Sequence, residues 1–264
     1  MIFAPLCLIL CWMLPVYSMK IRFNVNIRDP KPSIPLSMAE DSIDDMYFGC
    51  DKAMMERVKE KFLEEEKYQK PFGETWKKAR ECAERKLEHR EDKALTIDHL
   101  QAICAYTDDN MYKMFNDAVR TQGSLYDSSF KFHSLHFLLI SAIQILKSDG
   151  YCHTTYRRSD VRFTGKVNDR IRFGSFASSS FRTYLTDFGH GTCFKIETCL
   201  GAPLKNYSVY DDTEAEVLIP PYEVFNITEI ISGQDKIAGL TDCEVLFVLK
   251  NAGCKSNLNC NAVC

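Results

Sequence analysis

Two carboxylates in the second half of the chain have a spacing that suits acid–base or electrostatic chemistry. Glu214 and Glu216 stand two residues apart, just before the apolar run VLIPP. Residues at this spacing share one face if both lie in a strand, and two ionised carboxylates so close require a cation or a special environment. A solvent-facing strand entrance that also carries Asp211 and Asp212 is the alternative explanation of these charges.

A cluster of hydroxyls, Ser178 to Ser180, follows Phe176. Such a cluster is typical of a turn or a strand end. A nucleophilic serine would need a histidine partner and a glycine-flanked turn motif that the sequence does not contain. Serine-hydrolase chemistry is therefore disfavoured.

Basic residues gather in the same half, beginning with the pair Arg157 and Arg158. They continue through Arg162, Lys166, Arg170 and Arg172. Guanidinium groups can hold phosphates in a bidentate manner, or they can form the solvated side of strands. No Gly-x-Gly-x-x-Gly motif and no phosphate loop occurs, so a nucleotide would be bound by a different scaffold.

These groups occur in an order that matches a known signature. TTYRRS, FGSFASSSF and TEAEVLIPPYEVF follow one another as do the arginine, serine and Glu-x-Glu segments of the vertebrate ecto-ADP-ribosyltransferases. AYTDDNMYKMFNDAVR and FKFHSLHFLLISAIQIL in the first half are similar to the same family. The chain thus resembles these arginine-specific enzymes across roughly residues 40–250.

The resemblance implies a role for each matched residue. Arg157, with Tyr156 beside it, would bind the pyrophosphate and adjoining ribose of NAD⁺, and Ser178 would fix the nicotinamide-side ribose. Glu216 would be the catalytic glutamate, and Glu214 would make arginine the acceptor. NAD⁺ would be a co-substrate, and the resemblance implies neither a metal nor a permanently bound cofactor.

The chemistry suits these roles. Departure of nicotinamide develops positive charge at the ribose C1′, which a carboxylate on the 2′-hydroxyl stabilises more in the transition state than in the ground state. The acceptor guanidinium is protonated and a poor nucleophile, so a second carboxylate must orient it and take a proton. We assign the first task to Glu216 and the second to Glu214.

Two positions depart from the family pattern. Arg158 stands where glycine is common, and Ala177 stands where threonine is more frequent. We expect Arg158 to reshape the mouth of the site or to add a phosphate contact. Tyr207 and Tyr210, just before the glutamates, either pack against nicotinamide or acceptor, or serve in ordinary loop packing.

The elements that must position these residues change character along the chain. Residues 51–147 predict helices, with an apolar stripe at helical spacing from Leu135 to Leu146. The expected helices are 51–66, 74–92, 96–105, 108–120 and 133–147. From Gly150 onward, short β-branched and aromatic runs are separated by Gly, Pro, Asn and Asp, which predicts strands.

The fold class is therefore α+β, with a helical half packed on a split two-sheet core of the ADP-ribosyltransferase type. Residues 1–18 are uncharged and apolar and predict a cleaved signal peptide, with an uncleaved anchor as the alternative. Residues 19–264 form one domain, mainly helical over about 40–147 and strand-rich over about 148–250, with a cysteine-containing tail at 251–264. The C-terminal residues carry no apolar anchor signal, so we expect free secretion.

Ten cysteines remain after the signal peptide, which predicts disulfides rather than zinc because no Cys-x-x-Cys pair occurs. The resemblance implies that Cys50 pairs with Cys243, and Cys152 with Cys199. It leaves six cysteines unassigned: Cys82, Cys104, Cys193, Cys254, Cys260 and Cys264. Sequons at Asn206 and Asn226 are candidate glycosylation sites.

The overall charge narrows the choice of partners. A formal net charge of −3 provides no basic field for nucleic acid or for an anionic membrane. We expect a monomer without stable membrane insertion, whose partners are NAD⁺ and arginine-containing acceptor proteins. An NAD⁺ glycohydrolase that uses water as acceptor, and a catalytically silent secreted binding scaffold, are the alternatives.

Overall fold

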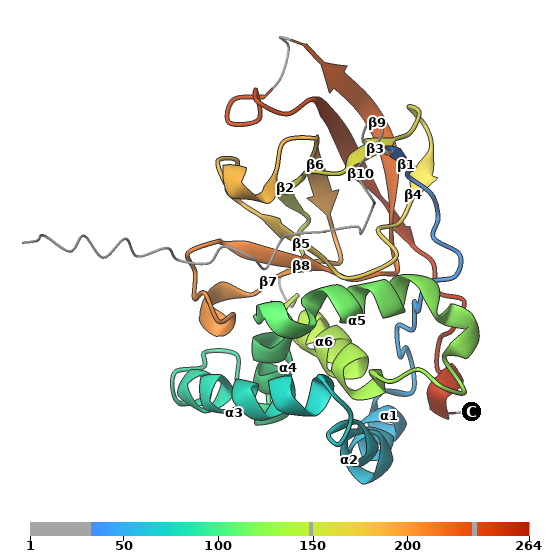
Figure 1. Cartoon of the computed structure of the whole chain (residues 1–264), viewed down its shortest axis with the longest axis vertical. Coiled ribbons are helices and arrows are strands. Elements are labelled where there is room, and N and C mark those ends of the chain that lie inside the picture. Colours follow the sequence, from blue (N-terminus) through green and yellow to red (C-terminus); the bar gives the residue numbers. More distant parts are fainter. Residues whose placement is uncertain (1–32, 148–149, 234–236, 264) are drawn as a thin grey trace, which may run out of the picture.

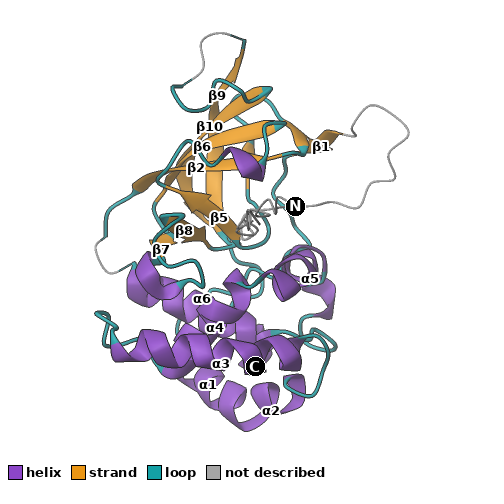
Figure 2. Cartoon of the chain, turned by 60° about the vertical axis from the view of Figure 1, so that its left-hand side comes forward, coloured by secondary structure: helices purple, strands orange, loops and turns teal. Residues whose placement is uncertain are grey.

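The helical and strand-rich halves of the chain form two packed layers in the computed structural model, which describes residues 33–147, 150–233 and 237–263. Helices occupy the lower part of the molecule and strands the upper part (Figures 1 and 2). The expected α+β class is confirmed. Residues 1–18, predicted as a signal peptide, lie outside the described residues.

The helices follow the predicted ranges. They are α1 (Asp51–Arg57), α2 (Leu63–Glu66), α3 (Phe72–Glu88), α4 (Ile97–Thr107), α5 (Asp109–Thr121) and α6 (His133–Leu146). A π-helical turn, Val58–Phe62, joins α1 to α2, so the expected continuous helix 51–66 has three parts. Short 3-10 turns occur at Gly123–Leu125, Thr186–Phe188, Lys205–Tyr207 and Asn261–Val263.

Helix α6 lies at the centre of the helical layer. Its predicted apolar stripe is buried, and so are Phe137 and Ile140 outside that stripe. His133 and His136 are buried as well, and burial lowers the pKa of His136 to about 3. His136 bonds the hydroxyl of Tyr47, at 2.8 Å, as a neutral core side chain.

The strands form one long sheet and a small accessory pair. The strands are β1 (Ser33–Pro35), β2 (His153–Ser159), β3 (Arg162–Thr164), β4 (Arg170–Ile171), β5 (Ala177–Ser180), β6 (Thr192–Thr198), β7 (Ala202–Pro203), β8 (Glu216–Ile219), β9 (Glu223–Ser232) and β10 (Val245–Cys254). Eight of them have the order β4-β9-β10-β6-β2-β5-β8-β7, and β1 pairs with β3.

The expected division into two sheets corresponds to one weak junction in this order. Strands β2 and β5 share a single residue pair, Tyr156 with Ser180, whereas β2 and β6 are paired over seven residues. The three-stranded part β5-β8-β7 lies next to the helices, as Figure 1 shows. The junction between Arg157 and the serines is therefore where the sheet opens.

Strands β5 and β8 have an apolar core on each face. Leu218 of β8 packs into the helical core, whereas its neighbour Ile219 and Ala177 of β5 belong to the core between the two parts of the sheet. Alternation along a strand requires this arrangement. Ser178 pairs with Leu218, so its side chain faces the helical layer.

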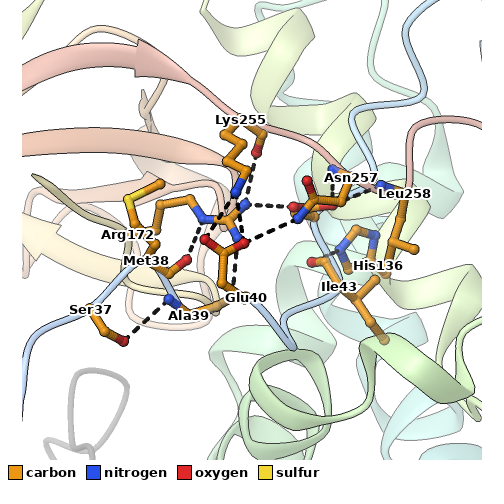
Figure 3. Close-up of polar contacts among 11 residues, drawn as sticks. Ser37, Met38, Ala39, Glu40, Ile43, His136, Arg172, Lys255, Asn257 and Leu258 are labelled. Atoms are coloured by element: carbon orange, nitrogen blue, oxygen red, sulfur yellow. Dashed lines mark hydrogen bonds and ion pairs between the residues drawn. The ribbon is translucent and has the colours of Figure 1, made fainter.

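The run RIRFGSF at residues 170–176, one of the β-branched and aromatic runs after Gly150 that predict strands, is a strand only at its first two residues. Arg172 leaves the sheet because its guanidinium forms a fully buried ion pair with Asp44, at 2.5 Å, and donates to the carbonyls of Met38, Ala39 and Lys255. Figure 3 shows how this side chain ties the N-terminal and C-terminal segments together. Arg172 is therefore neither a phosphate ligand nor part of a solvated face.

Gly174 turns the chain from this cluster into β5. Its φ is +67°, and a Cβ at this position would lie 2.3 Å from the Cβ of Ala39. Both the left-handed backbone and the close approach therefore require glycine. The turn sets the start of the strand that carries Ser178.

The described residues form four disulfides, and one of the two expected pairs is among them. Cys152–Cys199 is confirmed. The expected Cys50–Cys243 pair is wrong: the bonds are Cys50–Cys260 and Cys193–Cys243, and Cys82–Cys104 is the fourth.

The topology of the chain explains the observed pairing. Strand β10 runs parallel to β6, with Leu246 opposite Cys193, so Cys243 reaches Cys193 within the sheet. The C-terminal tail returns to the start of α1, where the Cys260 amide donates to Asp45. Cys254 is exposed and has a free thiol.

Within the described ranges, no helix is long and apolar enough to cross a bilayer. No group of three His, Cys, Asp or Glu side chains in those ranges is arranged to hold a metal ion. Four disulfides fit an extracellular protein.

Candidate active site

Arg157 and Ser178 meet where β2 and β5 diverge. The Arg157 side chain is 1% exposed, and its Nη1 donates to the carbonyl oxygen of Ser178. Its Nη2 is buried without a hydrogen-bond partner among the described residues. A buried guanidinium with an unused donor is costly unless an anionic or polar ligand completes it.

Helices α4 and α5 cover this point with polar side chains. The hydroxyl of Tyr106 lies 3.4 Å from the Ser178 Oγ and accepts a hydrogen bond from the Asn116 amide, at 3.3 Å. The Asn116 Oδ1 and the Tyr112 hydroxyl are buried and lack hydrogen-bond partners within the described part of the chain. Unsatisfied donors and acceptors therefore gather beside Ser178, as expected of a site for a polar ligand.

A second guanidinium lies near Arg157. Arg120 of α5 donates to the Phe173 carbonyl and, at 2.7 Å, to the Ser175 Oγ. Burial lowers the pKa of Arg120, and the charge of Arg157 lowers it further. Arg120 was not predicted from the sequence as a site residue, although it ends the segment AYTDDNMYKMFNDAVR that resembles the family.

Glu216 lies at the start of β8, opposite Ser180 of β5, and its side chain is 1% exposed. It also contributes to the electrostatics at Tyr106. Burial is the largest cause of the raised pKa of Tyr106, followed by the charge of Tyr112, and the charge of Glu216 adds to it. The structure therefore brings Arg157, Ser178 and Glu216 together.

Glu214 does not lie in the same strand. It belongs to the turn before β8, and Ala215 between the two glutamates has a left-handed φ of +45°. The condition for a shared strand face, that both carboxylates lie in one strand, is therefore not met. Glu216 lines a hollow of about 340 Å³ with Asn206 and Phe181, whereas Glu214 lines a neighbouring hollow of about 570 Å³ with Tyr184 and Tyr210.

Residues 36–239 match the family described as NAD:arginine ADP-ribosyltransferase. The chain belongs to this family.

Two curated relatives illustrate the similarity. The human ecto-ADP-ribosyltransferase 5 is 38% identical over 216 residues, which are 75% of this chain and 72% of the relative. The chicken erythroblast NAD(P)(+)–arginine ADP-ribosyltransferase is 34% identical over 245 residues, which are 89% of this chain and 78% of the relative.

Solved structures support the same assignment. The eukaryotic mono-ADP-ribosyltransferase ART2.2, crystallised as a mutant in complex with NADH, superposes with a TM-score of 0.73 at 31% identity, covering 86% of this chain and 98% of that one. Another ART2.2 mutant was solved in complex with NAD. The fold of this chain is therefore that of the ADP-ribosyltransferases.

Arg158, where the ADP-ribosyltransferase pattern commonly has glycine, faces away from Arg157. It forms a bidentate ion pair with Asp242, at 2.8 and 2.9 Å, and donates to the carbonyls of Thr183, Gly189 and Gly239. Its donors are thus engaged in holding two loops. The expected contact with a phosphate is not part of this arrangement.

Tyr156 shares that opposite face. Its side chain packs against the small core around Leu240 and Leu246. The strand alternates, so the Tyr156 ring lies away from the Arg157 guanidinium. A contact between Tyr156 and NAD⁺ would have to come from its backbone, which pairs with Ser180.

The two tyrosines before the glutamates differ in role. Tyr207 is buried, and its hydroxyl donates to the Asp92 carboxylate, at 2.8 Å, and accepts from the Glu91 and Asp92 amides. These contacts pack the Tyr207 loop against the segment between α3 and α4. Tyr210 instead lines the hollow that contains Glu214.

Proposed function

We propose that the protein transfers ADP-ribose from NAD⁺ to arginine side chains of other proteins and releases nicotinamide. The observation that carries the proposal is the convergence of Arg157, Ser178 and Glu216 in a chain of this family. The neighbouring guanidinium of Arg120 supports it, because two buried cations favour a pyrophosphate between them.

The transfer balances as a substitution at the ribose C1′. The bond from C1′ to the nicotinamide nitrogen breaks, and its electron pair leaves with nicotinamide. A guanidino nitrogen of the acceptor forms the new bond to C1′ and loses one proton. Glu216 stabilises the cationic sugar by accepting a hydrogen bond from its 2′-hydroxyl, and Glu214 takes the proton.

The position of Glu214 favours arginine transfer over hydrolysis. In hydrolysis the acceptor is water, which needs no carboxylate to orient it. In transfer the acceptor is a planar, cationic guanidinium, which does need one. Glu214 lies in its own hollow beside Tyr184 and Tyr210, where a cation can also contact aromatic rings. A silent scaffold would have no use for this group of buried polar side chains.

The test uses labelled NAD⁺ and the small guanidine agmatine with the oxidised protein. Glu216→Gln should lose both agmatine labelling and nicotinamide release. Glu214→Gln should lose labelling and keep nicotinamide release. If the wild-type protein releases nicotinamide without labelling agmatine, it is an NAD⁺ glycohydrolase. If it does not turn over NAD⁺ at all, the alternative of a catalytically silent binding scaffold is favoured.

We further propose that the protein is secreted as a glycosylated monomer after cleavage following Ser18. The disulfides support export, and both sequon asparagines, Asn206 and Asn226, are exposed. Mass measurement of the protein secreted by animal cells, before and after removal of N-glycans, tests the cleavage and both glycans. Size-exclusion chromatography with light scattering tests the monomer.

A further inference from the structure

Three consecutive residues at the end of β5 hold four consecutive carbonyl groups of the turn that precedes Glu216. Arg182 donates from Nη2 to the Asp212 carbonyl, at 3.3 Å, and from Nη1 to the Thr213 carbonyl. The Ser180 Oγ donates to the Glu214 carbonyl, at 2.5 Å. The Phe181 amide donates to the Ala215 carbonyl, at 3.2 Å.

The contacts are themselves linked. The Ser180 Oγ also accepts a hydrogen bond from the Arg182 amide, at 2.9 Å, so one hydroxyl links the Arg182 backbone to the Glu214 carbonyl. Together, the contacts of residues 180–182 with the carbonyls of residues 212–215 form a clasp. The Arg182 guanidinium lies 6.0 Å from the ring of Tyr184, which lines the Glu214 hollow. The planar, forked shape of the group matches two adjacent carbonyls in a way that a lysine ammonium does not.

The two glutamates depend on this clasp to different degrees. Glu216 belongs to the ladder between β5 and β8, which pairs four residues on each strand. Glu214 lies outside that ladder, in a turn whose backbone includes the left-handed residue Ala215. Loss of the Arg182 contacts would therefore displace Glu214 more than Glu216.

We propose that Arg182 is a positioning residue that sets the partition between arginine transfer and hydrolysis of NAD⁺. It acts through the backbone of residues 212–213 and holds the Glu214 carboxylate where the acceptor guanidinium arrives. This inference rests on the proposed transferase function. It assigns Arg182 no contact with NAD⁺ or with the acceptor.

The experiment compares Arg182→Gln with the wild-type protein, both full-length, in the agmatine assay. It measures labelled agmatine and total nicotinamide release. Arg182→Gln should lower the ratio of transfer to hydrolysis by about tenfold, because a displacement of a reacting group by about 1 Å costs one to two orders of magnitude. Hydrolysis without acceptor should change by less than about threefold by the same reasoning. The ratio of transfer to hydrolysis in Arg182→Lys should lie between those of the wild-type protein and Arg182→Gln.

The matched control is Arg170→Gln. Arg170 is exposed whereas Arg182 is half-buried, but Arg170 also donates to a backbone carbonyl, that of Ala252 at 3.3 Å, and it lies on β4 at the far edge of the sheet. The control removes the same charge and should leave the ratio unchanged. Thermal unfolding of each variant separates loss of fold from loss of positioning.

The outcomes separate the two proposals. A wild-type protein that labels no agmatine would refute the transferase function itself. If the wild-type protein labels agmatine but Arg182→Gln keeps the wild-type ratio, or lowers transfer and hydrolysis in proportion, Arg182 is not a positioning residue. Should Arg182→Gln fail to fold, the ratio in Arg182→Lys decides by the same criterion.

Discussion

Arg120 and Arg157 place two guanidinium groups from α5 and β2 close enough for the charge of one to lower the pKa of the other. Arginine remains protonated in proteins, so these two side chains repel each other in a buried environment. The arrangement is favourable when an anion lies between them. The pyrophosphate of NAD⁺ supplies such an anion, and its negative charge is delocalised over several oxygens.

Replacing Arg120 tests this relationship. We expect Arg120→Met to raise the KM for NAD⁺ by about tenfold or more, since a charge-assisted contact with phosphate is worth roughly 1.5–3 kcal/mol. Lys113→Gln removes a charge from the same helix at a position that lines a different hollow, and its KM should stay near the wild-type value. Steady-state kinetics of both variants would decide, and an unchanged KM in Arg120→Met would contradict a phosphate contact.

Neighbouring arginines in β2 should have opposite phenotypes. Arg157→Met should abolish turnover of NAD⁺, because it removes a proposed phosphate ligand. Its effect on stability should be modest, because the buried charge that it removes is repelled by Arg120. Arg158→Met should lower the free energy of unfolding by about 2–3 kcal/mol, because it leaves Asp242 and the carbonyls of Thr183, Gly189 and Gly239 without the donors of a buried guanidinium. Its KM for NAD⁺ should remain within about twofold of wild type, since its donors serve only the loops.

Chemical denaturation and NAD⁺ kinetics on the same two preparations make the comparison. The expected result is a crossed pattern, with activity lost in one variant and stability lost in the other. A large rise of KM in Arg158→Met would instead place its side chain at the phosphates.

The corrected disulfide pairing can be checked directly. Peptide mapping without reduction should find Cys50 linked to Cys260, and Cys193 linked to Cys243. The Cys50–Cys260 bond spans 210 residues, and a loop of this length stabilises the folded state by up to about 5 kcal/mol in the chain-entropy description. The double variant Cys50→Ser, Cys260→Ser should therefore unfold at markedly lower denaturant concentration, and a Cys50–Cys243 peptide would refute the pairing.

Local patterns predicted most of the elements. The apolar repeat from Leu135 to Leu146 identified α6, because helical periodicity survives wherever a helix meets a core. The β-branched run around Arg157 identified β2 for the corresponding reason in strands. β1 was missed because it lies in the Pro-rich segment at 30–35, where proline argues against a strand and only the partner β3 creates one.

One wrong pairing and two features that the sequence did not predict depend on the folded backbone. The pairing of Cys50 depends on the return of the C-terminal tail to α1, which no local pattern encodes. The departure of Glu214 from the strand depends on the left-handed conformation of Ala215, an uncommon state for a residue with a Cβ. Arg120 was missed because a single basic residue at the end of a helix is usually solvated, and its location beside Arg157 is a tertiary feature.

We expect His99, in the first turn of α4, to limit the stability of the protein in acid. His99 is buried and takes part in a capping box with Thr96, and burial, with a smaller effect of the Lys59 charge, lowers its pKa to about 4. The unfolded chain binds a proton near pH 6.5, whereas the folded chain does so only near pH 4. The folded state therefore loses stability as the pH falls from about 6.5 to about 4.

His99→Gln isolates this contribution, because glutamine also completes a capping box but does not titrate. The variant should match the wild type at pH 7.5 and exceed its stability by about 2 kcal/mol at pH 4.5. The comparison cancels the titration of the other buried histidines, which both proteins share. Urea unfolding at the two pH values makes the measurement, and an equal difference at both would show that His99 does not resist protonation.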